Sequence, residues 1–519
     1  MQLGDLIEGL EITLDRESDR TARICDITED SRTVMPGSLF IARPGTKVDG
    51  RKFIEAAIAA DAAAILTDPL AARPAGSEEV AWLTTTDLAR AEALLAERFF
   101  GAPASRLALA GVTGTNGKTT VAHLVHQLLN DSGVRCGLIG TVQVDDGCAV
   151  AKAAMTTPPA LELSFSLARM LEHGCKACSM EVSSHSLDQQ RVAALDYRVA
   201  IFTNLTGDHL DYHGTMENYA AAKAKLFEML RPESTAVINA DDPWHGRMVR
   251  GCRGRVLRCS TRRGPETDCW VAVREMSIRG TEASFGGPWG VIEGSTRLIG
   301  SYNVMNVLQA LAAAHALGVE RDEMALSLHG LRPPPGRLER VDPPEGEAPF
   351  AVFVDYAHTD DAMEKALGAL RPLLAGTGGR LRVVFGCGGD RDRTKRPRMA
   401  RAASRLADEV IVTSDNPRTE KPHQIISEIL AGIETDEAMS RVHVDADRRA
   451  AIFRGVQGAQ PGDIVLIAGK GHEDYQLLPD GEGGVRRIDF DDRRVAAEAL
   501  HARLKPGAGA ALEQELRAT

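Results

Sequence analysis

Four apolar runs in the C-terminal part of the 519-residue chain limit its fold more than any other feature. They read FAVFVDYAH, LRVVFGCGGD, EVIVTSDN and DIVLIAGKGHE, and the stretches between them have helical periodicity. Short apolar strands that alternate with helices form mostly parallel sheets with helices on both faces. This region is therefore predicted to be a Rossmann-like α/β domain.

Each of these runs leads directly into a cluster of polar residues. In an open α/β sheet the ligand crevice lies outside the carboxyl ends of the strands, so polar residues that follow different strands meet there. We therefore expect six side chains to converge on one cleft: Asp355, His358, Arg391, Asp415, Arg418 and Glu473.

The segment SDNPR, residues 414–418, has two interpretations. Asp, Asn and Pro are common turn residues, so the segment could be a surface turn with a solvated arginine. Alternatively, Pro417 removes φ freedom directly before Arg418 and holds the guanidinium rigidly for a substrate. Asp415 and Asn416 would then either hold the amino end of that substrate or brace the loop.

The segment GVTGTNGKTT, residues 111–120, follows the apolar run LALAGV and precedes a helical pattern. Its glycines let backbone N–H groups surround phosphate oxygens, Lys118 can neutralise the β- and γ-phosphates, and Thr119 can ligate magnesium. Gly111 precedes Gly117 by six residues and not by the five of the common nucleotide loop. The GKTT ending nevertheless favours ATP binding over a ligand-free turn.

Further candidate residues lie in the segments CSMEVSS and TNLTGDHLDYHG and in the predicted helix MENYAAAKAKLFEML. Glu181, at the end of a predicted strand, could reach magnesium held on the phosphate loop. His209 and His213 are four residues apart, but Leu210 stands where zinc proteases require glutamate, so zinc is not favoured. Composition alone favours a solvated side chain for Lys223.

Bulk properties exclude several classes of protein. A formal charge of −11 argues against a general nucleic-acid or anionic-membrane surface. Nine cysteines lack a disulfide-like rhythm, and the pair Cys175 and Cys178 has no second ligand pair for a metal. The start, MQLGDLIEGLEI, carries acids where a signal peptide carries basic residues, and no apolar run approaches the ~20 residues of a membrane span. We expect a cytoplasmic, monomeric enzyme with no nucleic-acid or membrane partner.

The chain length suggests about three domains. Breaks at ERFFGAPASRL and LRPPPGR predict domains at residues 1–102, 103–334 and 335–505, followed by a tail at 506–519. The first contains one clear apolar strand at 38–42, and the second is predicted to be an α/β domain of the P-loop type.

Several motifs occur in one order along the chain: GTNGKTT, EVSSHSLDQQRV, TNLTGDHLDYHG, GSYNVMNVLQAL, GRLERV, DYAHT, GCGGDRDRTKRP, SDNPR and AGKGHEDYQ. Together they resemble the Mur ligases of peptidoglycan synthesis over about residues 28–490. The resemblance implies three domains that bind a UDP-sugar, the phosphates of ATP and an amino acid, in that order. Two positions depart from the family pattern: Asp360 replaces a proline after YAHT, and Gly207 stands where a larger residue is common.

The resemblance implies an ATP-dependent ligase that uses Mg²⁺. Lys223 matches a lysine that carbon dioxide converts to a carbamate, which with His209 binds a second magnesium ion, while Glu181 serves the metal pair and Thr119 the phosphate-bound ion. Asn303 matches an adenine contact, Asp355 a contact to the ribose, and His358 and Arg337 lie near the nucleotide. The implied catalytic residues are Lys118, Glu181, His209 and Lys223. The implied ATP-binding residues are Gly114, Thr115, Asn116, Gly117, Lys118, Thr119, Thr120, Asn303, Arg337 and Asp355.

The implied reaction joins meso-2,6-diaminopimelate to UDP-N-acetylmuramoyl-L-alanyl-D-glutamate through an acyl phosphate. The residues implied for the nucleotide substrate are Ser31, Thr156, Thr157, Ser183, Gln189 and Arg191. Those implied for diaminopimelate are Arg391, Asp415, Asn416, Pro417, Arg418, Gly469 and Glu473.

Three alternatives remain. The lysine-adding enzyme of the same pathway differs only in the pocket for the amino acid. Folylpolyglutamate synthase shares the phosphate loop and the carbamate but is not expected to carry the DSR and DNPR segments. A regulatory ATPase or UDP-sugar-binding module would have lost ligase chemistry, and the intact Lys118, Glu181, His209 and Lys223 argue against it.

Overall fold

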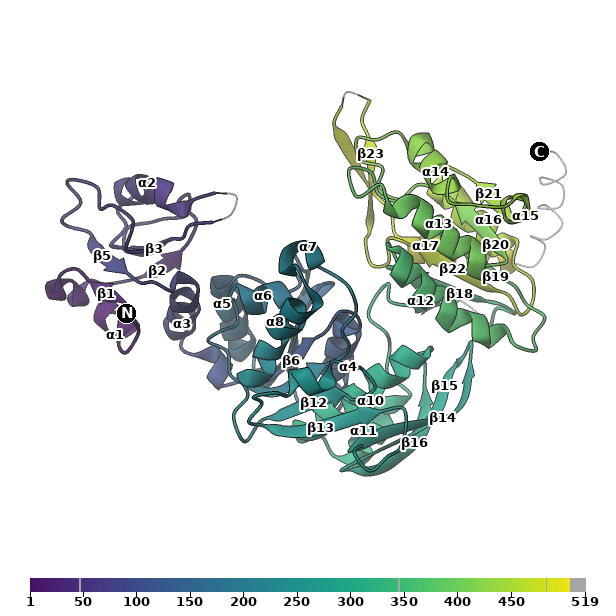
Figure 1. Ribbon diagram of the computed structural model, residues 1–519, viewed down its shortest axis with the longest axis horizontal. Helices are drawn as coiled ribbons and strands as arrows, with labels where there is room; N and C mark the ends of the chain where they lie inside the picture. Colours follow the sequence, from purple (N-terminus) through teal and green to yellow (C-terminus); the bar gives the residue numbers. More distant parts are fainter. Residues whose placement is uncertain (46–47, 344–345, 482, 505–519) are drawn as a thin grey trace. The chain divides into compact units, whose positions relative to one another are not determined.

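The computed structural model describes residues 1–45, 48–343, 346–481 and 483–504 (Figure 1). The predicted tail, 506–519, lies outside the described residues. Contacts divide the chain into two compact units, which are described separately. The first comprises 1–271, 285–292 and 305–327, and the second comprises 272–284, 293–304 and the residues from 328 onward.

The first sheet has five strands in the order β1-β5-β4-β3-β2, of which only β1 and β5 pair antiparallel. Its apolar faces are covered by α3 on one side and α2 on the other. The apolar strand predicted at 38–42 is β3, which is confirmed. The elements are α1 (Leu3–Ile7), β1 (Thr13–Leu14), β2 (Asp26–Thr28), β3 (Ser38–Ala42), α2 (Ile54–Ala59), β4 (Ala64–Thr67), β5 (Ala81–Thr84) and α3 (Leu88–Phe99).

The second sheet has eleven strands in the order β16-β15-β14-β13-β12-β11-β6-β10-β7-β8-β9. The six neighbouring strands β13, β12, β11, β6, β10 and β7 pair parallel, as the alternating pattern predicts. Its strands are β6 (Ala108–Thr113), β7 (Cys136–Ile139), β8 (Gln143–Asp145), β9 (Val150–Lys152), β10 (Ala177–Glu181), β11 (Tyr197–Phe202), β12 (Thr235–Asn239), β13 (Arg255–Ser260), β14 (Cys269–Ser277), β15 (Gly280–Gly287) and β16 (Gly290–Thr296).

Along this part of the chain, helices alternate with the strands. The predicted helix in MENYAAAKAKLFEML is α8, whose N-cap Thr215 accepts a hydrogen bond from the Asn218 backbone N–H at 3.2 Å. The helices are α4 (Lys118–Asp131), α5 (Ala160–Glu172), α6 (Ser184–Asp188), α7 (Leu210–His213), α8 (Met216–Glu228), α9 (His245–Met248), α10 (Ser301–Ala316) and α11 (Arg321–Leu328).

The third sheet has the order β17-β18-β22-β19-β20-β21, and only β17 pairs antiparallel. The four predicted apolar runs form β18, β19, β20 and β22, which confirms the parallel α/β prediction. The strands are β17 (Glu339–Val341), β18 (Ala351–Asp355), β19 (Leu381–Phe385), β20 (Glu409–Val412), β21 (Val442–Val444) and β22 (Ile464–Ala468). A separate antiparallel hairpin consists of β23 (Tyr475–Pro479) and β24 (Val485–Asp489).

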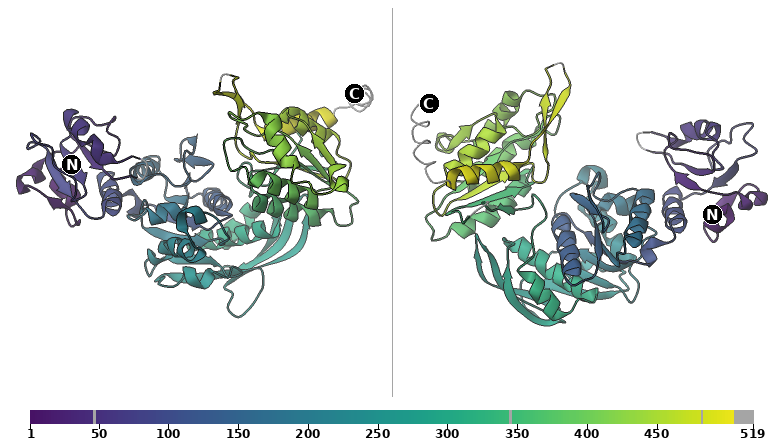
Figure 2. Two further views of the ribbon diagram at one scale, coloured as in Figure 1. Left: turned by 45° about the horizontal axis from the view of Figure 1, so that its top comes forward. Right: turned by 180° about the vertical axis from the view of Figure 1, so that it is seen from behind.

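Helices cover both faces of the third sheet, so its core is buried on two sides. Apolar residues of α12 (Asp360–Leu370), α13 (Lys395–Leu406) and α14 (Pro422–Leu430) pack on one face. Those of α16 (Arg448–Gln457) and α17 (Asp492–Leu504) pack on the other, and α15 (Asp436–Met439) precedes β21. The green α12 and α13 lie over the sheet in Figure 1, and the yellow α17 lies over it when seen from behind in Figure 2.

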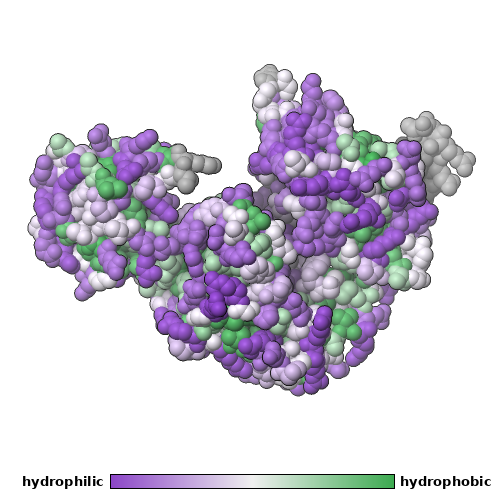
Figure 3. Space-filling view, viewed as in Figure 1, coloured by the Kyte–Doolittle hydropathy of each residue, from purple (hydrophilic) through white to green (hydrophobic). Residues whose placement is uncertain are grey.

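The face of the molecule shown in Figure 3 is mainly hydrophilic, with apolar residues scattered in small groups. No helix within the described part of the chain is long and apolar enough to cross a membrane.

Candidate active site

The phosphate-loop segment joins β6 to α4, as predicted. Gly117 is the N-cap of α4 with a φ of +84°, and Gly114 has a φ of +146°. A Cβ atom at Gly114 would lie 1.9 Å from Thr203 Oγ1, so only glycine fits there. Asn204 braces the loop because its Oδ1 accepts a hydrogen bond from the Asn116 N–H at 3.1 Å. The loop therefore presents the N-terminus of a 14-residue helix, which favours anion binding.

Two lysine side chains meet at one backbone carbonyl of this loop. Lys118 Nζ donates hydrogen bonds to the Gly114 and Thr115 carbonyl oxygens, both at 2.9 Å. Lys223 Nζ, from α8, donates to the same Gly114 oxygen at 2.8 Å and lies 4.5 Å from the centre of the Tyr219 ring. The two amines therefore occupy the same small region of the site.

Lys223 is almost completely buried, with 1% of its surface exposed. Burial, and then the nearby Lys118 charge, hold the pKa of the Lys223 amine well below its usual value. The composition-based prediction that Lys223 is solvated is therefore wrong. A lowered pKa increases the fraction of the amine in its uncharged form, which is the form that acts as a nucleophile.

Glu181 ends β10 and is 1% exposed. Its Oε1 accepts a hydrogen bond from the Thr141 N–H at 2.7 Å and its Oε2 accepts one from Thr141 Oγ1 at 3.0 Å. Thr141 Oγ1 in turn lies 3.0 Å from Thr156 Oγ1. Thr141 belongs to none of the motifs, and no sequence signal indicated it.

Four of the residues predicted to contact the nucleotide substrate, Thr157, Ser183, Gln189 and Arg191, form one connected network. Thr157 Oγ1 donates to the Glu181 carbonyl at 2.9 Å and accepts from the Ser183 N–H at 3.1 Å. Arg191 donates to the Thr157 carbonyl at 2.9 Å and to Gln189 Oε1 at 2.7 Å. Residues from three segments are thus held together beside Glu181.

His209 directly precedes α7 and has a left-handed φ of +53°, which is uncommon for a residue other than glycine. Its ring lies 4.9 Å from that of His185 and 6.2 Å from that of Tyr219, the same tyrosine that contacts Lys223. His213 Nε2 instead shares a hydrogen bond with Ser184 Oγ at 3.0 Å. The ring of His213 also lies near those of His185 and Tyr219, at 5.6 Å and 5.1 Å, so the two histidines share part of their surroundings.

The residue types at this site offer ligands that suit magnesium better than zinc. Among the residues that the structure describes, no three or more His, Cys, Asp and Glu side chains form a metal-binding group. Zinc needs such a group, but Mg²⁺ is held by one or two carboxylates together with substrate phosphates and water. Glu181, Thr119 and a carbamate at Lys223 would provide hard oxygen ligands, so these residue types fit magnesium with ATP. Unmodified Lys223 offers no oxygen ligand.

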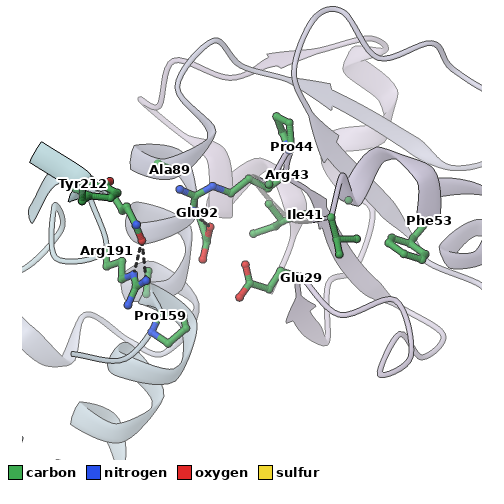
Figure 4. Close-up of a pocket in the computed structure, with 15 residues that line it drawn as sticks. Glu29, Ile41, Arg43, Pro44, Phe53, Ala89, Glu92, Pro159, Arg191 and Tyr212 are labelled. Atoms are coloured by element: carbon green, nitrogen blue, oxygen red, sulfur yellow. Dashed lines mark hydrogen bonds and ion pairs between the residues drawn. The ribbon is translucent and has the colours of Figure 1, made fainter. Parts of the chain in front are cut away.

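A cavity of about 510 Å³ lies within the first unit (Figure 4). It includes the predicted Gln189 and Arg191, whereas Ser31 lies in a turn after β2 and does not line it. The lining residues are Glu29, Ile41, Arg43, Pro44, Gly45, Val48, Gly50, Phe53, Ala89, Glu92, Pro159, Ala160, Gln189, Arg191 and Tyr212.

Charged residues of both signs face this cavity. Arg43 Nη1 donates to Glu92 Oε2 at 3.2 Å, and burial followed by the Glu29 charge raises the pKa of Glu92 to about 7. Burial and the nearby Arg43 lower the pKa of Arg191. Two guanidinium groups beside one cavity suit an anionic ligand. The sequence did not indicate Arg43 and Glu92, because both lie outside its motifs.

Asn303, Arg337 and Asp355 belong to the second unit. Asp355, at the end of β18, accepts hydrogen bonds from the Leu338 N–H at 2.6 Å and the Ala357 N–H at 2.8 Å. Burial raises the pKa of Asp355, and Arg337 opposes that rise. Arg337 stacks 4.8 Å from the centre of the Tyr356 ring, and Asn303 Nδ2 donates to the Ile299 carbonyl at 2.9 Å.

The SDNPR segment is a braced loop and not a solvated turn. Arg418 is half-buried, and its φ of +55° is in the left-handed region. Its backbone N–H donates to the Leu477 carbonyl at 3.0 Å, and its Nη1 donates to the Gly389 carbonyl at 2.6 Å. Hydrogen bonds therefore hold both the backbone and the side chain of Arg418. Strained φ angles of this kind are concentrated at functional sites.

Asn416 resolves one of the open alternatives, because its side chain braces the loop. Its Oδ1 accepts from the Leu477 N–H at 3.0 Å and from Lys470 Nζ at 3.2 Å, and its Nδ2 donates to Glu473 Oε2 at 2.8 Å. Lys470, fully buried in the motif AGKGHE, was not identified from the sequence.

The remaining predicted residues lie at the same edge of the third sheet. A Cβ at Gly469 would lie 2.6 Å from Asp415 Oδ2, and one at Gly388 would lie 2.9 Å from Arg418 Nη1 and 3.8 Å from Arg391 Cγ. The Gly469 N–H donates to the Asp355 carbonyl at 3.1 Å. The carboxyl ends of four strands thus bring these groups together.

The two departures from the family pattern have simple structural settings. Asp360 is the first residue of α12, where an acidic side chain is favourable, and it pairs with Arg398 at 3.3 Å. A Cβ at Gly207 would meet nothing within 4 Å, so a larger residue would fit.

Three family descriptions match the chain in succession. The catalytic domain of the Mur ligase family matches residues 23–99, the Mur ligase middle domain matches 112–314, and the Mur ligase glutamate ligase domain matches 336–471. A solved folylpolyglutamate synthase from Mycobacterium tuberculosis covers 73% of this chain and 92% of its own, with a TM-score of 0.56 and 19% identity. That likeness concerns the fold alone.

Relatives with higher identity cover nearly the whole chain. The UDP-N-acetylmuramoyl-L-alanyl-D-glutamate–2,6-diaminopimelate ligase of Synechococcus elongatus is 46% identical, covering 92% of this chain and 94% of its own. The enzyme of the same name from Geobacillus thermodenitrificans is 44% identical, covering 91% and 94%. A solved structure of an enzyme of that name has 33% identity and a TM-score of 0.72, covering 98% and 100%. The chain belongs to the Mur ligase family.

Proposed function

We propose that this protein uses ATP to add meso-2,6-diaminopimelate to UDP-N-acetylmuramoyl-L-alanyl-D-glutamate in the cytoplasm. The names of the relatives support this assignment, since 46% identity extends over 92% of the chain. The geometric observation that carries it is the meeting of Lys118 and Lys223 at the Gly114 carbonyl. A simple ATPase would need Lys118 to bind phosphate but has no evident use for Lys223.

An amine cannot displace oxygen from a carboxylate directly, because that oxygen is a poor leaving group, so the carboxylate is first phosphorylated by ATP. The side-chain carboxylate of D-glutamate attacks the γ-phosphorus of ATP, ADP leaves, and an acyl phosphate forms. The amine of diaminopimelate then attacks the acyl carbon, loses a proton, and inorganic phosphate leaves from the tetrahedral intermediate. Lys118 and the loop amides offset the negative charge that develops on the transferring phosphoryl group.

Mg²⁺ would be held by Thr119, Glu181, His209 and the carbamate of Lys223. When bound, it supplies positive charge that neutralises the phosphate oxygens. The carbamate forms when the Lys223 nitrogen bonds to the carbon of CO₂ and one proton leaves to solvent. The buried amine next to Lys118 thereby becomes an anion, which the positive charge of Lys118 attracts.

The cavity in the first unit would bind part of the UDP-sugar peptide. Arg43 and Arg191 face it with positive charge, and the network of Thr157, Ser183 and Gln189 leads from it to Glu181. The substrate carboxylate would thereby be brought toward the phosphate loop.

One experiment tests the proposal and its alternatives together. The full chain is given ATP, Mg²⁺ and UDP-N-acetylmuramoyl-L-alanyl-D-glutamate with single amino acids, and the product is identified by mass. We expect the diaminopimelate adduct and phosphate release that depends on all three substrates. A lysine adduct would identify the lysine-adding enzyme, and phosphate release without either acceptor would identify an ATPase.

Lys118→Ala should lower ligase turnover by about 10²-fold, because the phosphoryl group loses its nearest fixed cation. The fold should be retained, since Lys118 belongs to a ligand-binding loop and donates hydrogen bonds to two carbonyls of that same loop. Turnover is measured by phosphate release, and folding by circular dichroism. Near-normal turnover would contradict the role given to this loop.

A further inference from the structure

Arg448, at the first position of α16, is a buried arginine that no motif indicated. Its side chain has no exposed surface, and neither has that of its partner Asp492, the first residue of α17. Arg448 Nε donates to Asp492 Oδ1 at 2.7 Å and Nη2 donates to Asp492 Oδ2 at 2.6 Å. This is a bidentate ion pair within the core of the second unit.

The remaining N–H groups of Arg448 reach two backbone carbonyls. Nη1 donates to the Ser414 carbonyl at 3.2 Å, and Nη2 donates to the Ala468 carbonyl at 3.0 Å. Ser414 follows β20 and directly precedes Asp415–Arg418, whereas Ala468 ends β22 and directly precedes Gly469. One guanidinium therefore holds the starting points of both loops proposed to bind diaminopimelate.

These two strands are not neighbours, because β19 lies between β22 and β20. The space between the loops is tight: a Cβ at Gly386, just after β19, would lie 2.3 Å from the Thr413 carbonyl oxygen. Sheet hydrogen bonds do not join β20 directly to β22. Arg448 joins the starting points of the two loops at the carboxyl end, and the bonds of Asn416 to Lys470 and Glu473 join the loops further along.

We propose that Arg448 is a positioning residue that sets the spacing of the two amino-acid-binding loops. A buried ion pair is seldom better for stability than apolar residues of similar volume, so stability alone is a weak reason for one here. Only arginine has a planar fork of five donors that can bind a carboxylate and two carbonyls together. This inference rests on the proposed function for the ligand that the loops bind.

The chain contains a matched control at the opposite ends of the same strands. Arg382, on β19, is nearly buried and pairs with Glu409, which begins β20, at 2.9 Å. It also pairs with Asp463, which directly precedes β22, at 3.1 Å. Arg382 therefore joins the amino ends of β20 and β22 just as Arg448 joins their carboxyl ends, and it lies far from the loops along each strand.

The test compares Arg448→Lys with Arg382→Lys in the full chain. Arg448→Lys should raise KM for meso-diaminopimelate by about 10- to 100-fold, since a small misplacement of binding groups has effects of that size. Its KM values for ATP and the UDP-dipeptide and its kcat at saturation should change little. Arg382→Lys should lower Tm with an unchanged KM for diaminopimelate. Equal KM values for meso-diaminopimelate in the two variants would overturn the proposal.

A second measurement does not depend on activity. In the ligand-free protein, the amides of Arg418 and Gly469 should exchange with deuterium faster in Arg448→Lys than in Arg382→Lys. If Arg448→Lys does not fold, Asp492→Asn replaces it in both measurements, because asparagine keeps the shape of the side chain but loses the charge and one of the two acceptor oxygens that hold the guanidinium. If the native chain ligates no amino acid, the proposed function fails, and the exchange comparison still decides the role of Arg448. Unchanged exchange would count against it.

Discussion

Lys223→Ala should lower ligase turnover by more than about 10³-fold, and formate or acetate should restore part of it. The reason is that the proposed carbamate would place an anion where the structure has a buried amine beside Lys118. Alanine removes the carbamate and leaves space for a small carboxylate next to the Gly114 carbonyl. The measurement is phosphate release with all three substrates, at increasing carboxylate concentration.

The control is Lys225→Ala, two residues further along α8. Lys225 is partly exposed and pairs with Asp188 at 2.9 Å, an interaction that contributes little near a surface. It should keep native turnover and show no response to carboxylates. Carbon-13 NMR of the native protein with labelled CO₂ should give a carbamate signal that Lys223→Ala lacks. An ATP-bound crystal with an unmodified amine at Lys223, far from any metal, would refute the carbamate.

Arg418→Ala should remove most of the discrimination between meso-diaminopimelate and L-lysine. Diaminopimelate is lysine with a second carboxylate on the far carbon, and a guanidinium pairs with a carboxylate through two parallel hydrogen bonds. Lysine would leave Arg418 unpaired in a partly dry site, so native discrimination in kcat/KM should reach about 10⁴. The bracing by Gly389 and Leu477 means that little ordering is lost on binding.

The measurement is kcat/KM for both amino acids in the native chain, in Arg418→Ala and in Arg401→Ala. Arg401 is exposed on α13 and pairs with Glu434 at 2.7 Å, so its variant should keep the native preference. Arg418→Lys should recover only part of the discrimination, because an ammonium cannot form the two parallel bonds. Native preference for lysine, or unchanged preference in Arg418→Ala, would show that the arginine does not recognise the carboxylate.

The sequence predicted the third sheet well because its strands are buried on both faces and appear as unbroken apolar runs. The runs do not specify which strand pairs with which, so the insertion of β22 between β18 and β19 could not be predicted. The edge strands β17 and β21 have three residues each and are partly exposed, and they gave no recognisable pattern.

The candidate site was predicted where local sequence carries the chemistry. Gly114 and Gly117 are required by positive φ angles within one short loop, and Pro417 and Arg418 are adjacent. Lys223 and Arg448 differ, because each lies among polar or small residues typical of an exposed helix. Their burial comes from contacts with segments 109 and 34 positions away, respectively, which no local pattern encodes.

The hairpin β23–β24 is joined to the SDNPR loop by three hydrogen bonds. The Arg418 N–H donates to the Leu477 carbonyl, the Leu477 N–H donates to Asn416 Oδ1, and Gln476 Nε2 donates to the Asp415 carbonyl. For protein engineering, residues 414–418 and 469–477 therefore form a single cassette. A chimera that receives only one of the two segments from another ligase would leave buried amide and carbonyl groups without partners. Amino-acid selectivity should thus be exchanged between ligases only when both segments are grafted together.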